Sequence, residues 1–219
     1  MDKLKFANIT KDNQARIDIF EKKTNTYVKF GQYNSFPNDL IELYNNSSIH
    51  NTCINAIVDG IVGEGLTADP EYVLDSANST SESWNDIFKK VAQDYKLYGG
   101  FAMEVIWNKS RTRITEVRAK EKDYRGRIPG YYVSDEWATD YRYGQAPIDD
   151  MPYLPMYNPK TNVDEPKQLY VFNPYRPGQK YYPLPDYVGA LRVIDLDTEV
   201  DNFHINNITN GLAPSLMVT

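Results

Sequence analysis

The chain has 219 residues, of which 41% are hydrophobic, and it carries a formal net charge of −6. This length suits one large domain or two small ones with a buried core, and the mean hydropathy of −0.60 indicates a wet surface. A dedicated non-specific nucleic-acid binder usually presents a basic face, so the acidic balance argues against that class. The acidic balance does not exclude a protein that lets DNA pass without binding it tightly.

Cysteine usage and the N-terminal sequence point to a reducing compartment. The single cysteine, Cys53, permits no disulfide within the chain. The opening residues MDKLKFANITKDNQ are charged and lack the apolar run of a secretory signal. No window approaches the length of a transmembrane helix. We therefore expect a soluble, intracellular protein that is not secreted and has no membrane partner.

The first 66 residues predict a strand pair followed by two helices. Alternating patterns at 16–20 and 26–30 predict two strands, with the polar residues 21–25 as their connection. Pro37 suits the first turn of a helix with a buried side of Leu40, Ile41, Leu43 and Tyr44. Ser47 or Ser48 then caps a second helix that ends at Gly63 and Gly65. Its apolar positions are Ile49, Cys53, Ile54, Ile57, Val58 and Ile61, and Cys53 is expected in the core.

A third helix and a hairpin follow the polar connector 67–80. Ser81 or Ser83 caps this helix, which ends at 97–100. Its apolar side chains are Trp84, Ile87, Phe88, Val91, Ala92 and Tyr95. The apolar run 101–107 predicts a buried strand, and 114–118 is expected to return antiparallel to it.

The composition changes after Lys120, where prolines and tyrosines accumulate. Nine of the 13 prolines lie between Pro147 and Pro185, and 12 of the 18 tyrosines lie between Tyr124 and Tyr187. Proline breaks helices and favours extended neighbours, so we expect ordered loops with short strands at 130–133 and 169–172. Tyrosine supplies these loops with apolar area and a polar tip.

The C-terminal stretch 183–219 predicts one long helix and a terminal strand. From Asp186 to Asn210 the helix would be about 37 Å long, with Gly211 suited to ending it. Its apolar pattern runs through Val188, Leu191, Ile194, Leu196, Val200 and Phe203. A helix of this length needs a partner surface, either within the chain or on a neighbouring subunit. We take Leu191, Ile194, Val200 and Phe203 as candidates for a subunit interface.

No catalytic or metal-binding constellation emerges from the motifs. Asp201 and His204 form a D-x-x-H step like half of a helical di-iron site, but no second such motif or further ligand set accompanies it. The alternating acids Asp195, Asp197, Glu199 and Asp201 are typical of a solvated helix face. The glycines at 60, 63 and 65 end a helix, which is the wrong dipole end for phosphate. We expect no enzyme activity, no cofactor and no metal.

Basic residues gather around the predicted hairpin. The cluster consists of Arg111, Arg113, Arg118, Lys120, Lys122, Arg125 and Arg127. A solvated hairpin explains it most simply, and a phosphate contact through Arg111 and Arg113 is the functional alternative.

Three stretches occur together in a fixed order. Residues 30–66 hold the helix pair, 94–107 hold a helix that ends in Tyr98-Gly99 and turns into an apolar strand, and 181–215 hold Tyr-Pro-x-Pro, the long helix, Asn-Gly and Pro-Ser. Together they resemble the portal proteins of tailed bacteriophages, the head-to-tail connectors, and this resemblance covers most of the chain. It implies an α+β fold with N-terminal helices, a small antiparallel sheet, Pro/Tyr-rich loops and one long C-terminal helix.

The resemblance also implies a structural role. Portal subunits form a dodecameric ring at one capsid vertex, contact the packaging motor and head-completion proteins, and let DNA pass without sequence recognition. The expected location is then the virion or the host bacterial cytoplasm. The stem and clip expected of a portal do not follow, so residues 1–219 resemble a single truncated wing-type region, from a phage or a prophage. Its parts would be 1–120 (helices and hairpin), 121–182 (loops and short strands) and 183–219.

Two other function classes stay open at the level of sequence. Tyrosine-rich loops around Tyr131, Tyr153 and Tyr181 would recognise a carbohydrate or peptide if they lined one concave surface. A helix-bound metalloenzyme built on Asp201 and His204 is the weaker alternative, because the ligands available in the sequence are too few.

Overall fold

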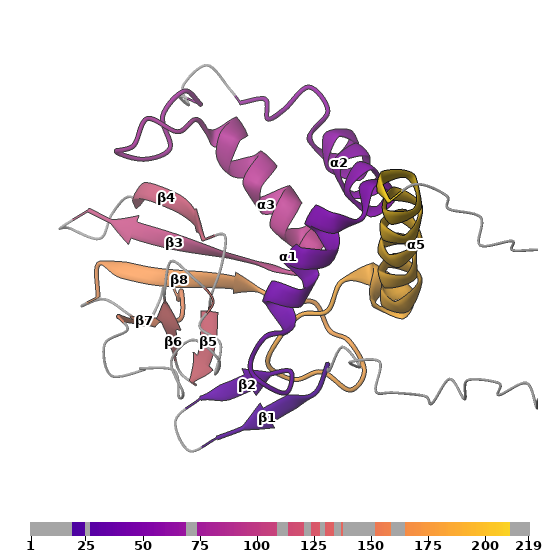
Figure 1. The fold of residues 1–219 in the computed structure, drawn as a ribbon. Helices are drawn as coiled ribbons and strands as arrows, with labels where there is room; N and C mark the ends of the chain where they lie inside the picture. The colour runs from indigo at the N-terminus through magenta and orange to yellow at the C-terminus, as the bar shows by residue number, and fades with distance from the viewer. Residues whose placement is uncertain are drawn as a thin grey trace, which may run out of the picture.

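The computed structural model describes residues 19–24, 27–68, 74–108, 114–120, 124–127, 130–133, 137, 152–158 and 165–210. Its fold is α+β, as the sequence predicts. Three helices lie on one side of small antiparallel sheets, and a long helix near the C-terminus stands at the edge of the molecule (Figure 1). Within these ranges, no helix is long and apolar enough to cross a membrane. The predicted terminal strand after Asn210 lies outside the described residues.

The N-terminal hairpin differs from the prediction in its first strand, whereas the second strand falls within the predicted 26–30. Residues 16–18 of the predicted first strand lie outside the described residues. Strand β1 (Glu21–Lys23) pairs antiparallel with β2 (Val28–Phe30), whereas the sequence placed 21–25 in the connection. That boundary was wrong because a distant segment holds Glu21 in extended geometry. Its carboxylate accepts backbone N–H bonds from Lys180, Tyr181 and Tyr182 at 3.0, 2.8 and 2.6 Å. The hairpin therefore clamps the segment that leads to the C-terminal helix.

The three N-terminal helices begin at the predicted caps. Helix α1 (Phe36–Asn46) carries Pro37 in its first turn, and Ser47 caps α2 (Ser48–Val62) by accepting the N–H of His50 at 3.1 Å. Ser83 and Asp86 form a reciprocal capping box at the start of α3 (Trp84–Tyr98). Gly99 follows α3 with φ of 83°, the left-handed conformation that ends helices.

Helix α3 packs against the first of two three-stranded sheets. Strand β3 (Phe101–Trp107) is central, with β4 (Ile114–Lys120) and β8 (Lys167–Phe172) antiparallel on either side. The second sheet has the order β5 (Tyr124–Arg127), β6 (Gly130–Val133) and β7 (Tyr153–Pro155). A bridge between Met156 and Leu169 joins the two sheets. The strands predicted at 101–107, 114–118, 130–133 and 169–172 are confirmed, whereas β5 and β7 were not predicted.

Tyr182 organises the main core. Its side chain is 1% exposed, stacks on Phe30 with ring centroids 4.9 Å apart, and meets Trp137 edge-on at 5.7 Å. The same cluster includes the buried side chains of α1 and Leu191 at the start of the long helix. The proline- and tyrosine-rich segment thus closes the N-terminal core instead of forming a separate layer.

The long C-terminal helix is shorter than predicted. Residues Asp186–Ala190 form the 3₁₀ helix η2, and the α-helix α5 runs from Leu191 to Thr209. Its 19 residues span about 29 Å. The prediction that the α-helix begins at Asp186 was wrong, because hydrogen bonds hold the residues just before it in a non-helical conformation. The Arg176 guanidinium donates to the carbonyl oxygens of Leu184 and Pro185 at 3.2 and 2.7 Å.

Candidate functional site

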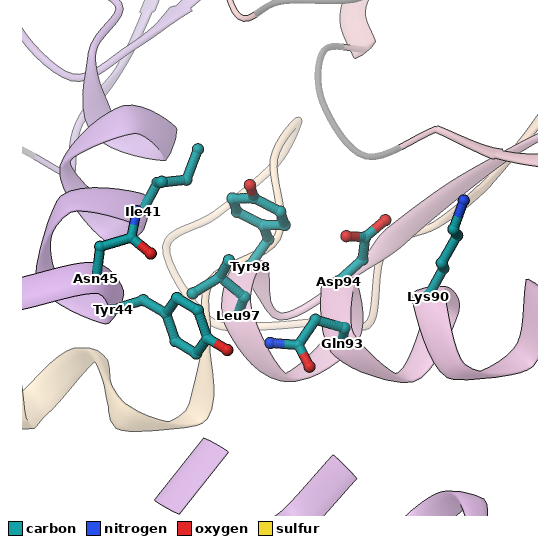
Figure 2. Close-up of a pocket in the computed structure, with 8 residues that line it drawn as sticks. All are labelled: Ile41, Tyr44, Asn45, Lys90, Gln93, Asp94, Leu97 and Tyr98. Carbon is teal, nitrogen blue, oxygen red and sulfur yellow. The ribbon is translucent and has the colours of Figure 1, made fainter. Parts of the chain in front are cut away.

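A cavity of about 300 Å³ opens between α1 and α3 (Figure 2). Its polar side chains are partly engaged by the protein itself. The Tyr44 hydroxyl donates to the Asn55 side chain at 2.7 Å, and the Lys90 ammonium contacts Glu82 at 2.5 Å. The cavity walls are mostly apolar and no nucleophile with a neighbouring base lines it. The lining residues are Ile41, Tyr44, Asn45, Lys90, Gln93, Asp94, Leu97 and Tyr98.

The acids and histidines of the sequence do not assemble into a metal site among the described residues. Groups of three or more potential ligands are absent from the described ranges. Asp201 and His204 are both exposed on α5, where the His204 ring lies against Phe203 at 5.8 Å. This arrangement gives the D-x-x-H step no further ligand. The structure does not test whether the protein has an enzyme activity, a cofactor or a metal, so their expected absence stays a prediction.

A polar junction holds the first half of α5 against α2. The Ser47 hydroxyl, which caps α2, donates to the carboxylate of Asp197 at 2.9 Å. His50 is buried and meets the Tyr187 ring edge-on at 4.4 Å. Burial lowers the pKa of His50 and raises the pKa of Tyr187 well above its usual value. Both groups are therefore neutral near pH 7, which suits packing between helices and not acid–base chemistry.

Helix α2 exposes an apolar stripe. Ile54 and Val58 are buried, at 3% and 1% exposure. Ile49, Ile57 and Ile61 are 62%, 45% and 43% exposed. Cys53 is also exposed, so the prediction that it lies in the core was wrong. The helix is apolar on two adjoining faces, and α1 and α3 together cover one of them. The apolar pattern of α2 is too broad for one buried face, and this breadth was the sequence signal that part of it would stay exposed.

The four predicted interface residues lie on two different faces of α5. Leu191 is 5% exposed in the main core, and Ile194 packs against the same cluster. Val200 and Phe203 are 44% and 63% exposed. The first two residues therefore bind α5 to its own chain, and the last two remain available to another molecule. Sequence periodicity alone did not separate these roles.

The predicted phosphate contact lies outside the described residues. Arg111 and Arg113 fall in the gap between β3 and β4, so the structure does not place them. The two strands on either side of this gap, β3 and β4, are paired from Ala102–Lys120 to Trp107–Ile114.

The three tyrosines of the ligand-binding alternative belong to different surroundings. Tyr131 packs against the cluster of Ala102, Val133 and Leu169, whereas Tyr181 packs against the main core. Tyr153 is 43% exposed on β7. None of the three lines the cavity between α1 and α3. The described structure therefore gives no support to a tyrosine-lined binding surface at these positions.

Comparison with known proteins supplies one line of evidence. No protein-family model matches the chain, and no curated protein matches its sequence. Among solved structures, the chain is similar to one from the neck of an empty GTA particle computed with C6 symmetry, with a TM-score of 0.56 and 13% identity. The likeness covers 81% of this chain and 48% of that chain, so this chain spans about half the length of its neighbour. At this identity the likeness shows a shared fold.

Proposed function

We propose that this chain is a structural subunit of a phage-like particle, located where head and tail meet, and that it forms the wing-type part of a portal ring. The observation that carries the proposal is the fold shared with a chain of a GTA particle neck over 81% of this sequence. The order of helix pair, apolar strand and C-terminal helix, on which the portal resemblance rests, is also the order in the structure. Such a subunit acts by assembly and not by catalysis.

The exposed apolar faces support a role in assembly. Helices α2 and α5 leave nine large apolar side chains exposed among the described residues: Ile49, Ile57, Ile61, Val193, Leu196, Val200, Phe203, Ile205 and Ile208. Exposed apolar side chains that line one face of a helix are typical of sites where another protein binds. A ring subunit needs contacts with copies of itself and with the proteins above and below it, which in this proposal are the packaging motor and the head-completion proteins.

The charge of the chain supports a channel function. A net charge of −6 gives DNA phosphates little reason to stay bound, and weak binding suits a ring through which DNA slides during packaging and ejection. The basic residues near Arg111 and Arg113 would supply the local contact with the passing backbone.

Native mass spectrometry over a range of protein concentrations tests the self-assembly. We expect species larger than dimers, up to a twelve-copy ring, and a loss of these species in Ile57→Asp, because a carboxylate on the α2 stripe is costly to bury. Thr52→Asp is the matched control, since Thr52 is exposed on a different face of the same helix. A chain that stays monomeric at every concentration, in the mass spectrometer and under the electron microscope, overturns the proposal.

A further inference from the structure

The outer side of α5 carries exposed apolar side chains. Leu196, Val200 and Phe203 are 61%, 44% and 63% exposed, and helical geometry places them on one side of the helix. Leu191 and Ile194, which bind α5 to the main core, point in the opposite direction. Helix α5 stands at the edge of the molecule (Figure 1), so a second molecule can reach its outer side. We call Leu196, Val200 and Phe203 the α5 edge.

The exposed Ile205 and Ile208 lie outside the α5 edge. At about 100° per residue, they are roughly 200° and 140° around the helix from Phe203. They therefore point away from a molecule that contacts Phe203. Since Phe203 is the bulkiest side chain of the α5 edge, it is the candidate anchor of a contact.

The cavity between α1 and α3 opens on the opposite side of α1 from α5. Leu43 of α1 lies in the same core cluster as Leu191 of α5. Ile41 and Asn45 line the cavity, and helical geometry puts both of them nearly opposite Leu43 on α1. The cavity and the α5 edge therefore lie on opposite sides of the chain. A head-to-tail contact between copies requires this arrangement, because it joins unlike patches.

The size and the lining of the cavity suit an aromatic side chain. The rings of Tyr44 and Tyr98 and the aliphatic side chains of Ile41 and Leu97 contribute its apolar walls (Figure 2). Its volume is about 300 Å³, whereas a cavity of about 150 Å³ is enough to hold a benzene ring. Aromatic rings pack favourably in tilted or offset arrangements, so a phenylalanine ring gains contacts with the tyrosines.

Lys90 is the charged group that a second molecule meets at the cavity. Asp94 also lines the cavity but is only 6% exposed, whereas the Lys90 side chain is 39% exposed. The Lys90 ammonium contacts Glu82 at 2.5 Å, and with three N–H donors it can bind a second carboxylate. Figure 2 shows Lys90 at one end of the cavity and Asn45 at the other.

The residues on either side of Phe203 match the two ends of the cavity. Glu199 and Asn207 lie one turn before and one turn after Phe203 on the same side of α5, about 12 Å apart along the helix axis. With the Phe203 ring in the cavity of another copy, the Glu199 carboxylate lies near the Lys90 ammonium. Asn207 then lies near Asn45, and two carboxamides can bond to each other. The reverse direction takes Glu199 away from Lys90, so the charges select one direction.

We propose that Phe203 of one copy inserts into the cavity between α1 and α3 of the next copy, with Glu199 at Lys90 and Asn207 at Asn45. The contact joins unlike patches, so it can repeat from copy to copy around a ring. It rests on the proposed self-assembly and gives the ring one defined contact.

Cross-linking between two different chains tests the contact. In a Cys53→Ser background, Asn45→Cys chains are mixed with Asn207→Cys chains that carry a longer tag, and a short bismaleimide is added. We expect more of the mixed covalent dimer than of either single-chain dimer. Asp201→Cys replaces Asn207→Cys in the control, because Asp201 is exposed on the other side of α5. Equal cross-linking of Asn45→Cys with the two α5 variants overturns the proposal.

Truncation of the anchor gives an independent readout. Phe203→Ala should weaken self-association at least about ten-fold in sedimentation equilibrium, because it removes a large apolar side chain from the centre of the contact. The control is Ile205→Ala, which shortens an exposed side chain on the other side of α5 and should leave association unchanged. Equal effects of the two variants overturn the role of Phe203.

A charge exchange tests the direction of α5 across the cavity. Glu199→Lys places two cations together and should weaken association roughly two- to five-fold. Adding Lys90→Glu to the same chain restores opposite charges at every contact and should recover the lost affinity. A double variant that associates no better than Glu199→Lys overturns the assigned direction.

The outcomes separate this contact from the ring. Ring-sized species in native mass spectrometry that Phe203→Ala does not weaken overturn the contact and leave the proposed function standing. A mixed cross-link between positions 45 and 207 in a protein that forms only short open chains supports the contact and counts against the ring.

Discussion

The hydroxyl of Tyr182 donates a hydrogen bond to the carbonyl oxygen of Val28, 2.5 Å away and 154 positions earlier in the chain. Tyr182→Phe removes this donor inside the main core and should lower the free energy of unfolding by about 1–3 kcal/mol. Urea denaturation followed by circular dichroism measures the change. Tyr175→Phe removes the hydroxyl of a side chain that is 90% exposed and should leave stability unchanged. Equal effects of both variants would show that Tyr182 does not hold β2.

Glu21→Gln tests the clamp between the hairpin and residues 180–182. The glutamine keeps one acceptor oxygen but loses the charge and the second acceptor, so we expect a loss of about 1.5–3 kcal/mol of stability. The control is Glu64→Gln, since Glu64 is exposed near the end of α2. Amide hydrogen exchange adds a local readout, in which the N–H groups of Tyr181 and Tyr182 should exchange faster in Glu21→Gln. Unchanged exchange at both amides contradicts the clamp.

Alanine variants of Gly99 and Gly178 distinguish the cost of backbone strain from the cost of a steric clash. Their φ angles are 83° and 85°, so an alanine at either position pays the cost of the left-handed conformation, about 1–2 kcal/mol. A Cβ at Gly99 would also collide with the backbone at Leu184, whereas a Cβ at Gly178 meets nothing within 4 Å. Gly99→Ala should therefore be the more destabilising by at least about 2 kcal/mol. Similar melting temperatures for the two variants would rule out the close approach.

Acid should destabilise the protein partly through His50. Burial lowers the pKa of His50 in the folded chain from the ordinary value of 6.5, and its Nε2 atom has no hydrogen-bond partner among the described residues. The unfolded chain therefore takes up this proton at a higher pH than the folded chain. The stability that neutral His50 contributes is complete above 6.5 and is lost as the pH falls from there toward the lower folded pKa.

Urea denaturation at pH 7.5 and 5.5 measures this loss. His50→Gln should show a smaller drop in stability between the two pH values than the unmodified chain. His204→Gln changes an exposed histidine of α5 and should keep the full drop. An identical drop in all three proteins would assign the pH dependence to other groups.

The two faces of α2 should respond differently to truncation. Val58→Ala removes two methyl groups from a side chain that is 1% exposed and should cost about 1.5–3 kcal/mol. Ile57→Ala removes more carbon from a side chain that is 45% exposed and should cost less than about 1 kcal/mol. Thermal unfolding of dilute monomer gives the comparison. A larger loss for Ile57→Ala would mean that its side chain packs in the monomer core.

Local sequence signals determined most of the element boundaries. Pro37, Ser47, Ser83 and Gly99 mark helix ends because proline, hydroxyl caps and left-handed glycine act within one turn of the chain. The strand at 101–107 followed from a short apolar run after glycines, and its neighbour from the turn-like residues between them. These signals need no knowledge of the rest of the fold.

The tertiary structure decided which apolar faces are buried and which are left for other molecules. Periodicity showed that α2 and α5 are amphipathic, but both helices have more apolar surface than their neighbours cover, and coverage depends on packing partners distant in sequence. Ser47 and Asp197, 150 positions apart, fix how α5 lies on α2. Glu21 became a strand residue because it binds backbone N–H groups about 160 positions later in the chain, a long-range constraint that no local propensity encodes.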